Sequence, residues 1–118
     1  MLQWMAIRVA LARREFGVAY PAMYKNDGGV FDCTQRAHQN TLETAPAQMV
    51  LVALLGLAHP VPAAAAQAAW VGGRVAYALG YSTGDPSKRL PGVAVSGLVY
   101  VATIGAALVE GAKMVLGG

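Results

Sequence analysis

An octapeptide in the first half of the chain, residues 36–43 (RAHQNTLE), gathers side chains that could bind a charged ligand. Its strongly polar members are Arg36, Gln39, Asn40 and Glu43. Their spacing of three and four residues places them on one face of a helix. An arginine can bind a carboxylate through paired hydrogen bonds, and an amide can form hydrogen bonds with peptide groups. A glutamate can accept a hydrogen bond from an ammonium group. The octapeptide therefore predicts either a site for a zwitterionic peptide or an internal polar network that joins helices.

A second polar stripe consists of Arg74, Tyr77 and Tyr81, which also lie at helical spacing. Tyrosines in such a pattern are often core residues or part of an interfacial belt. The arginine argues for a site instead, because a charge inside an apolar segment needs a partner. We expect that partner to be Glu43 or the carboxylate of a ligand.

Two pairs of basic residues lie at the ends of apolar segments. Arg13-Arg14 follows the first apolar segment, and Lys88-Arg89 precedes the last one. Such pairs anchor membrane helices at the positively charged side. They also offer chemistry, because a cation beside a thiol favours the thiolate and lowers the thiol pKa below its free value of about 8.5.

Histidine and cysteine indicate no metal or redox motif. His38 lies roughly opposite the polar stripe, which fits either a core histidine or a hydrogen bond at a subunit interface. His59 precedes a proline and is expected to be solvated. Cys33 is the only cysteine, which excludes an intrachain disulfide and a paired-cysteine motif. No set of His, Cys and carboxylate residues has metal-ligand spacing, so we expect no metal.

The composition is typical of an integral membrane protein. Of 118 residues, 56% are hydrophobic and only 13% are charged, whereas soluble domains carry about 25% charged residues. The net charge of +3 comes from scattered basic residues, without the cluster that nucleic-acid binding requires. We therefore predict an all-α, membrane-embedded four-helix bundle and no nucleic-acid partner.

The predicted helices of this single domain, residues 1–118, cover about 1–14, 34–58, 62–81 and 91–116. The last three reach the roughly 20 residues that a membrane span needs, and the first does not. Either the first helix is short and tilted, or it is truncated and an upstream stretch is missing; we expect the second. In the last helix, Glu110 and Lys113 can pair, and several small residues suit close helix packing. These small residues are Gly92, Ser96, Gly97, Gly105, Ala106 and Gly111.

Basic residues concentrate in the first and third connections, around residues 13–36 and 88–89. By the positive-inside rule these connections face the cytoplasm, together with the polar stripe. The alanine-rich composition favours a bacterial inner membrane over the endoplasmic reticulum.

The chain resembles the MAPEG family (membrane-associated proteins in eicosanoid and glutathione metabolism), most closely its type 3 microsomal glutathione transferases. The resemblance is carried by residues 12–24 (ARREFGVAYPAMY), 31–43 (FDCTQRAHQNTLE), 73–77 (GRVAY) and 80–89 (GYSTGDPSKR). These segments occur in the family's order and extend over most of the chain. The resemblance implies a homotrimer in the lipid bilayer that binds glutathione between neighbouring subunits on the cytosolic side.

The resemblance also implies roles for individual residues. Arg89 would hold the sulfur of glutathione as a thiolate, although an ungapped match falls on Lys88, and Arg14 would assist the electrophile. Ala6 and Thr44 depart from the family, which has a serine and an aromatic residue there. The glutathione contacts implied for this chain are Arg13, Arg36, His38, Asn40, Glu43, Arg74, Tyr77, Tyr81 and Lys88.

The activity implied is transfer of glutathione, as co-substrate, to a hydrophobic or lipid electrophile, with reduction of lipid hydroperoxides as a further activity. The alternative is a non-catalytic lipid-binding scaffold, because the same family contains a member that presents a fatty acid to another enzyme. Retention of Arg36, Asn40, Glu43, Tyr77, Tyr81 and Arg89 together favours the enzyme.

Overall fold

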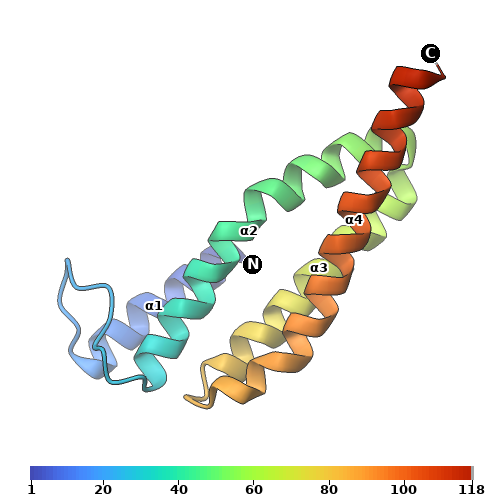
Figure 1. Cartoon of the computed structure of the whole chain (residues 1–118). Helices are drawn as coiled ribbons and strands as arrows, with labels where there is room; N and C mark the ends of the chain where they lie inside the picture. Colours follow the sequence, from blue (N-terminus) through green and yellow to red (C-terminus); the bar gives the residue numbers. More distant parts are fainter. Residues whose placement is uncertain (118) are drawn as a thin grey trace.

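A computed structural model describes residues 1–117 (Figure 1). Within these residues the regular structure is entirely helical, as predicted. The elements are α1 (Leu2–Phe16), α2 (Val30–Ala58), α3 (Pro60–Tyr81), the 3-10 helix η1 (Pro86–Arg89) and α4 (Leu90–Leu116).

The starts of α2 and α3 differ from the sequence prediction for local reasons. α2 begins four residues early, because the carboxylate of Asp32 in its first turn accepts hydrogen bonds from the backbone N–H groups of Lys25, Asp27 and Gly28. α3 begins at Pro60, since a proline fits the first turn of a helix. The chain then turns between α2 and α3 at the single residue His59.

Helices α2, α3 and α4 pack together, while α1 packs against α2 (Figure 1). The connections from α1 to α2 and from α3 to α4 lie at one end of the bundle, and the turn from α2 to α3 lies at the other (Figure 1). α2 contains Pro46, which lacks a backbone N–H and disturbs the helical hydrogen bonding. The second half of α2 leads away from α1 towards the start of α3 (Figure 1).

Close packing of α3 and α4 depends on small residues at the contact. A side chain at Gly92 would overlap the backbone of Tyr77, and one at Gly73 would meet Ser96. The predicted packing role is therefore confirmed for Gly92 and Ser96. Within the single chain, Gly97, Gly105 and Gly111 have no neighbour within 4 Å of an added Cβ, so for them the packing role stays a prediction. The predicted Glu110–Lys113 pair is confirmed, with 2.7 Å between its charged atoms.

Two segments, Val30–Ala58 and Pro86–Leu116, are long and apolar enough to cross a membrane. Three such segments were predicted; α3 has 22 residues, but its many alanines and glycines give it less hydrophobic character. The outer face of α4 exposes large apolar side chains, including Leu98, Val101 and Leu108. Because contact between such an apolar face and water is unfavourable, the bundle is compatible with insertion into lipid.

Candidate functional site

Most of the predicted site residues meet in one open cavity at the end of the bundle that carries the α3–α4 connection. Its volume is about 330 Å³, within the range of small-molecule sites. α2, α3, η1 and α4 all contribute to its wall, whereas α1 does not. We call it the site cavity; its lining residues are Arg36, Asn40, Arg74, Tyr77, Tyr81, Arg89 and Val93.

Arg74 is fixed at the base of the site cavity by α2. Its Nε and one terminal nitrogen donate to the hydroxyl of Thr41 at 3.0 and 2.8 Å, and the same terminal nitrogen donates to the amide oxygen of Asn40 at 2.6 Å. Thr41 is fully buried, and its own hydroxyl proton goes to the carbonyl of Ala37. The guanidinium therefore has a set position, with further N–H groups still free to bind a ligand.

No carboxylate among residues 1–117 lies within 4 Å of the Arg74 guanidinium. Of the two partners expected for Arg74, Glu43 is wrong, because Glu43 binds Arg36 at 2.8 Å instead. These two residues are seven apart on α2 and meet on its exposed surface. Arg74 has only 5% of its surface exposed, and a buried charge is stable only with strong partners. An anionic ligand would supply the missing charge.

Arg89 and Lys88 are adjacent in sequence but differ in position. Arg89 is half-buried, lines the site cavity and donates to the hydroxyl of Tyr81 at 3.1 Å. Lys88 is exposed and does not line the site cavity. The turn that carries both begins at Asp85, whose carboxylate accepts hydrogen bonds from the backbone and side chain of Ser87. These bonds lower the pKa of Asp85 below its usual value.

Tyr77 and Tyr81 pack against each other, and each also packs against one arginine of the site cavity. Their ring centres lie 5.5 Å apart. The guanidinium carbon of Arg74 lies 4.0 Å from the ring centre of Tyr77, and that of Arg89 lies 5.1 Å from the ring of Tyr81. Stacking on aromatic faces stabilises both cations where water is scarce. Tyr77 and Tyr81 are therefore core residues and cavity residues at once.

His38 faces a different cavity, of about 270 Å³, which lies between α1 and α2 and includes Arg13 in its lining. Gln39 also lines this α1–α2 cavity. The prediction that Gln39 shares the face of Arg36 and Asn40 is therefore wrong, because its position falls at the edge of that stripe, turned towards α1. The predicted opposite orientation of His38 agrees with its place in this cavity.

Arg13 is engaged by the loop that follows α1. It donates to the carbonyl oxygens of Ala22 at 2.7 Å and Val18 at 3.4 Å. Its guanidinium carbon lies 4.3 Å from the ring centre of Tyr20 and 5.5 Å from that of Phe31. Arg13 therefore orders the loop beside the α1–α2 cavity.

Arg14, the next residue, is exposed at the end of α1 and does not line the site cavity. Arg14 of α1 and Arg89 of η1 therefore do not line a common cavity within one chain.

Sequence reasoning missed Thr41 and Val93. Thr41 belongs to the octapeptide, and its hydroxyl was a signal of a polar contact towards another helix. Val93 gave no signal, because an apolar residue on an apolar helix is ordinary. Gly92, next to it, brings this part of α4 against Tyr77.

The charge of the site cavity favours an anion with more than one acidic group. Arg36, Arg74 and Arg89 contribute three positive charges against the single carboxylate of Glu43, which leaves a local charge of +2. No group of three metal-ligating side chains occurs among residues 1–117.

The sequence model of the MAPEG family matches residues 1–109. That match contains the octapeptide, the second stripe, both basic pairs and the whole site cavity. A family of membrane proteins that includes glutathione transferases accounts for the apolar helices and for a basic cavity at one end of them. The chain belongs to the MAPEG family.

Proposed function

We propose that this protein is a membrane-embedded glutathione transferase of the type 3 microsomal class, which joins the thiolate of glutathione to hydrophobic electrophiles. The observation that carries the proposal is the buried Arg74, held by Thr41 and Asn40 and without a carboxylate partner in the described chain. Reduction of lipid hydroperoxides is proposed as a second activity.

Glutathione matches the site cavity in charge and in functional groups. Its two carboxylates suit the guanidinium groups of Arg36 and Arg74, which bind carboxylates through paired hydrogen bonds. Its ammonium suits Glu43, which accepts from Arg36 at the exposed edge. Asn40, Tyr77 and Tyr81 complete this set of contacts, and Arg13, His38 and Lys88 are proposed as contacts from outside the site cavity.

Arg89 is proposed to stabilise the sulfur of glutathione as a thiolate. A nearby guanidinium favours the charged form, and each pKa unit by which it lowers the thiol corresponds to about 1.36 kcal/mol. The bond from Arg89 to the Tyr81 hydroxyl holds the cation at the cavity wall. The protein then contributes position and charge, while glutathione brings the nucleophile.

In the transfer reaction, the sulfur lone pair forms a carbon–sulfur bond. In a substitution the leaving group departs with its electron pair, and in an addition the resulting carbanion takes a proton. Arg14 is proposed to stabilise this negative charge. In the peroxidase reaction, two glutathione molecules are oxidised to the disulfide as the hydroperoxide is reduced to an alcohol and water.

A homotrimer is proposed because the implied contacts divide between two cavities of the chain. Arg36, Asn40 and Arg74 line the site cavity, whereas Arg13 and His38 line the α1–α2 cavity. One ligand reaches both sets only if the α1–α2 cavity of one protomer faces the site cavity of its neighbour. Head-to-tail contacts of this kind close into rings.

We further propose a multi-pass protein whose site cavity faces the cytoplasm, in a bacterial inner membrane. The α1–α2 and α3–α4 connections, which carry most of the basic loop residues, lie at the same end of the bundle as the site cavity (Figure 1). Basic connections are retained on the cytoplasmic side during insertion.

The first test is the ultraviolet absorption band of the glutathione thiolate, recorded with purified protein near neutral pH. We expect the band in the wild type and its loss in the Arg89→Ala variant, with glutathione binding reduced less than tenfold. Lys88→Ala is the comparison variant, since Lys88 is the neighbouring cation outside the site cavity. As a proposed contact it should weaken glutathione binding, but at saturating glutathione this variant should keep the band.

Two results would contradict the proposal. A band that survives in Arg89→Ala and disappears in Lys88→Ala transfers the thiolate role to Lys88. Binding of glutathione without a thiolate band in the wild type argues against a transferase and for the lipid-binding scaffold.

A further inference from the structure

Two glutamines lie inside the helix bundle, where membrane helices ordinarily carry apolar side chains. Gln48 of α2 has none of its surface exposed, and its side-chain Nε2 and Oε1 have no hydrogen-bond partner among residues 1–117. Gln67 of α3 is half-buried, and within the same residues its Oε1 is also buried without a partner. Burial of an amide that forms no hydrogen bond is unfavourable, so nearly all such groups in proteins have a partner. Three buried polar atoms therefore require a partner that the described chain does not supply.

The register of α2 against α3 places the two amides at the same level of the bundle. The helices run in opposite directions (Figure 1), and Arg74 donates to the hydroxyl of Thr41 at 3.0 and 2.8 Å. Gln48 follows Thr41 by seven residues, and Gln67 precedes Arg74 by seven. Seven residues make two turns, or roughly 10 Å of helix, and return to nearly the same face. Gln48 and Gln67 therefore follow the bonded pair on the two facing surfaces.

α2 and α3 are also in contact beyond this level, towards the turn that joins them. A Cβ added to Gly56 of α2 would lie 3.9 Å from the Cβ of Ala63 of α3. Pro46 therefore does not separate the inner faces of the two helices. Trp70, which lies one turn from Gln67 on α3, is only 2% exposed. The space around the two amides is thus enclosed by closely packed helices.

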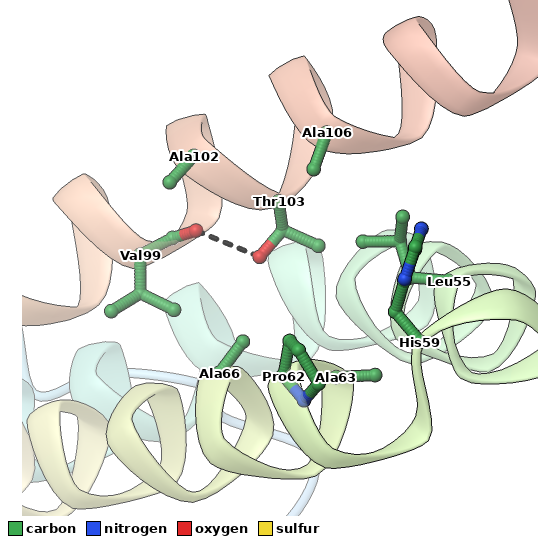
Figure 2. Close-up of a pocket in the computed structure, with 9 residues that line it drawn as sticks. All are labelled: Leu55, His59, Pro62, Ala63, Ala66, Val99, Ala102, Thr103 and Ala106. Carbon is green, nitrogen blue, oxygen red and sulfur yellow. Dashed lines mark hydrogen bonds between the residues drawn. The ribbon is translucent and has the colours of Figure 1, made fainter. Parts of the chain in front are cut away.

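The neighbouring cavities do not supply the partner. A cavity of about 320 Å³ lies between α2, α3 and α4 near the α2–α3 turn, and alanines such as Ala66 and Ala106 line it (Figure 2). Neither Gln48 nor Gln67 lines this cavity or the site cavity. A ligand of substrate size in either place is therefore not the partner of the two amides. Protein interiors are packed without voids much larger than a water molecule, so the partner must be small.

We propose that one water molecule is bound between Gln48 and Gln67 and joins α2 to α3 inside the bundle. The three atoms without a partner are two acceptors, the Oε1 atoms, and one donor, the Nε2 of Gln48. A water molecule donates one hydrogen bond to each acceptor and accepts one from Nε2. Three hydrogen bonds are typical of a buried water. The proposal does not depend on glutathione binding, because neither glutamine lines the site cavity.

Proton-detected solid-state NMR measures this water directly. The full chain is isotope-labelled in its glutamine side chains and reconstituted in bilayers of deuterated phosphatidylcholine, and magnetisation is transferred from water protons to the side-chain amides. Sequential assignment, checked by the loss of the signal in Gln48→Met, identifies the amide of Gln48. We expect this amide to receive magnetisation from water, although its side chain is fully buried.

Removal of the second acceptor tests the bridge. Gln67→Met lacks Oε1, so the transfer from water to Gln48 should fall at least fivefold. Gln3→Met is the matched control, because Gln3 is exposed on α1, and it should leave the transfer unchanged. In thermal unfolding, Gln48→Met and Gln67→Met should each lower the unfolding temperature, because each leaves a buried polar group without its partner. The double variant removes both amides and should unfold at a higher temperature than either single variant.

The opposite results would overturn the proposal. A wild-type spectrum without transfer from water to Gln48 excludes the bound water, and this measurement stands even if a variant does not fold. A cross-peak between the two side-chain amides in such a spectrum would mean that the glutamines bond directly. Transfer that survives in Gln67→Met means that the water is bound to Gln48 alone and does not join the helices. An unfolding temperature that rises in Gln48→Met and is unchanged in Gln67→Met means that Gln48 is buried without any partner.

Discussion

At the scale of residues, the decisive feature is how a buried arginine is held. Arg74 donates three hydrogen bonds, all to α2, and its cation lies over Tyr77. None of these partners carries a negative charge. Neutral acceptors fix the direction of the guanidinium and leave its charge uncompensated, which is the condition in which it attracts an anion most strongly.

This arrangement predicts the effect of Thr41→Val. The substitution keeps the shape of the side chain and removes the oxygen that accepts from two nitrogens of Arg74. A hydrogen bond to a charged group contributes about 1.5–3 kcal/mol, so we expect glutathione affinity to fall by roughly tenfold or more. Isothermal titration calorimetry of the purified protein measures this change.

The control is Thr34→Val, because the hydroxyl of Thr34 is also buried but bonds only the carbonyl of Val30 in its own helix. It should leave the affinity within about twofold of the wild type. Equal losses in both variants would mean that Thr41 acts through general stability rather than through Arg74.

At the scale of elements, the contact of α3 with α4 and η1 assembles the site cavity. Tyr77 and Arg74 come from α3, Arg89 comes from η1, and Val93 comes from the first turn of α4. Gly92 lets the backbones meet at this level, because an added Cβ would overlap Tyr77. The distance between the two arginines therefore depends on how closely the helices approach.

We predict that Gly92→Ala separates α3 from α4 at the site. Overpacking of this kind costs about 1–3 kcal/mol, so the unfolding temperature should fall and glutathione binding should weaken together. Gly97→Ala is the control, since nothing lies within 4 Å of a Cβ there. Alanine favours a helix over glycine by up to about 1 kcal/mol, so this variant should unfold at the same temperature or higher. Thermal unfolding in detergent distinguishes the two variants.

At the scale of the whole molecule, one helix serves two cavities. α2 contributes Arg36 and Asn40 to the site cavity and His38 and Gln39 to the α1–α2 cavity. The two sets point in different directions, because successive helical residues are rotated by about 100°. A single chain therefore exposes two incomplete polar surfaces, which a ring of copies would join.

Subunit mixing tests this arrangement. Arg14→Ala and Arg89→Ala each should lower transferase activity at least tenfold in a pure preparation. In a proposed head-to-tail ring with equal random mixing, roughly a quarter of the interfaces combine the intact Arg14 of one protomer with the intact Arg89 of another. Co-expressed variants should thus recover about a quarter of wild-type activity, measured with a chromogenic hydrophobic electrophile.

Activity that stays at the level of the single variants would mean that Arg14 and Arg89 act within the same subunit or that Arg14 has no catalytic role. The fraction of each variant in the mixture is checked by mass spectrometry of the intact subunits.

The sequence by itself determined the helical architecture and most members of the site cavity. Hydrophobic composition and proline placement are local properties, and the three- and four-residue spacing of Arg74, Tyr77 and Tyr81 defines one face wherever the helix lies. The close contact at Gly92 and Ser96 was also readable, because small residues mark helix contacts in apolar segments. These features depend on neighbours in sequence.

The tertiary structure decided which partners the polar side chains have. By residue type, Glu43 could have paired with Arg74. In the structure it binds Arg36 instead, because these two long side chains lie two turns apart on the same face of α2. The angles and distances between helices also decide three other features of the site. Gln39 and Asn40 line different cavities, Arg89 rather than Lys88 lies at the cavity wall, and Thr41 accepts hydrogen bonds from Arg74. Periodicity fixes a direction around one helix axis, whereas a bond across helices requires the relative placement of two.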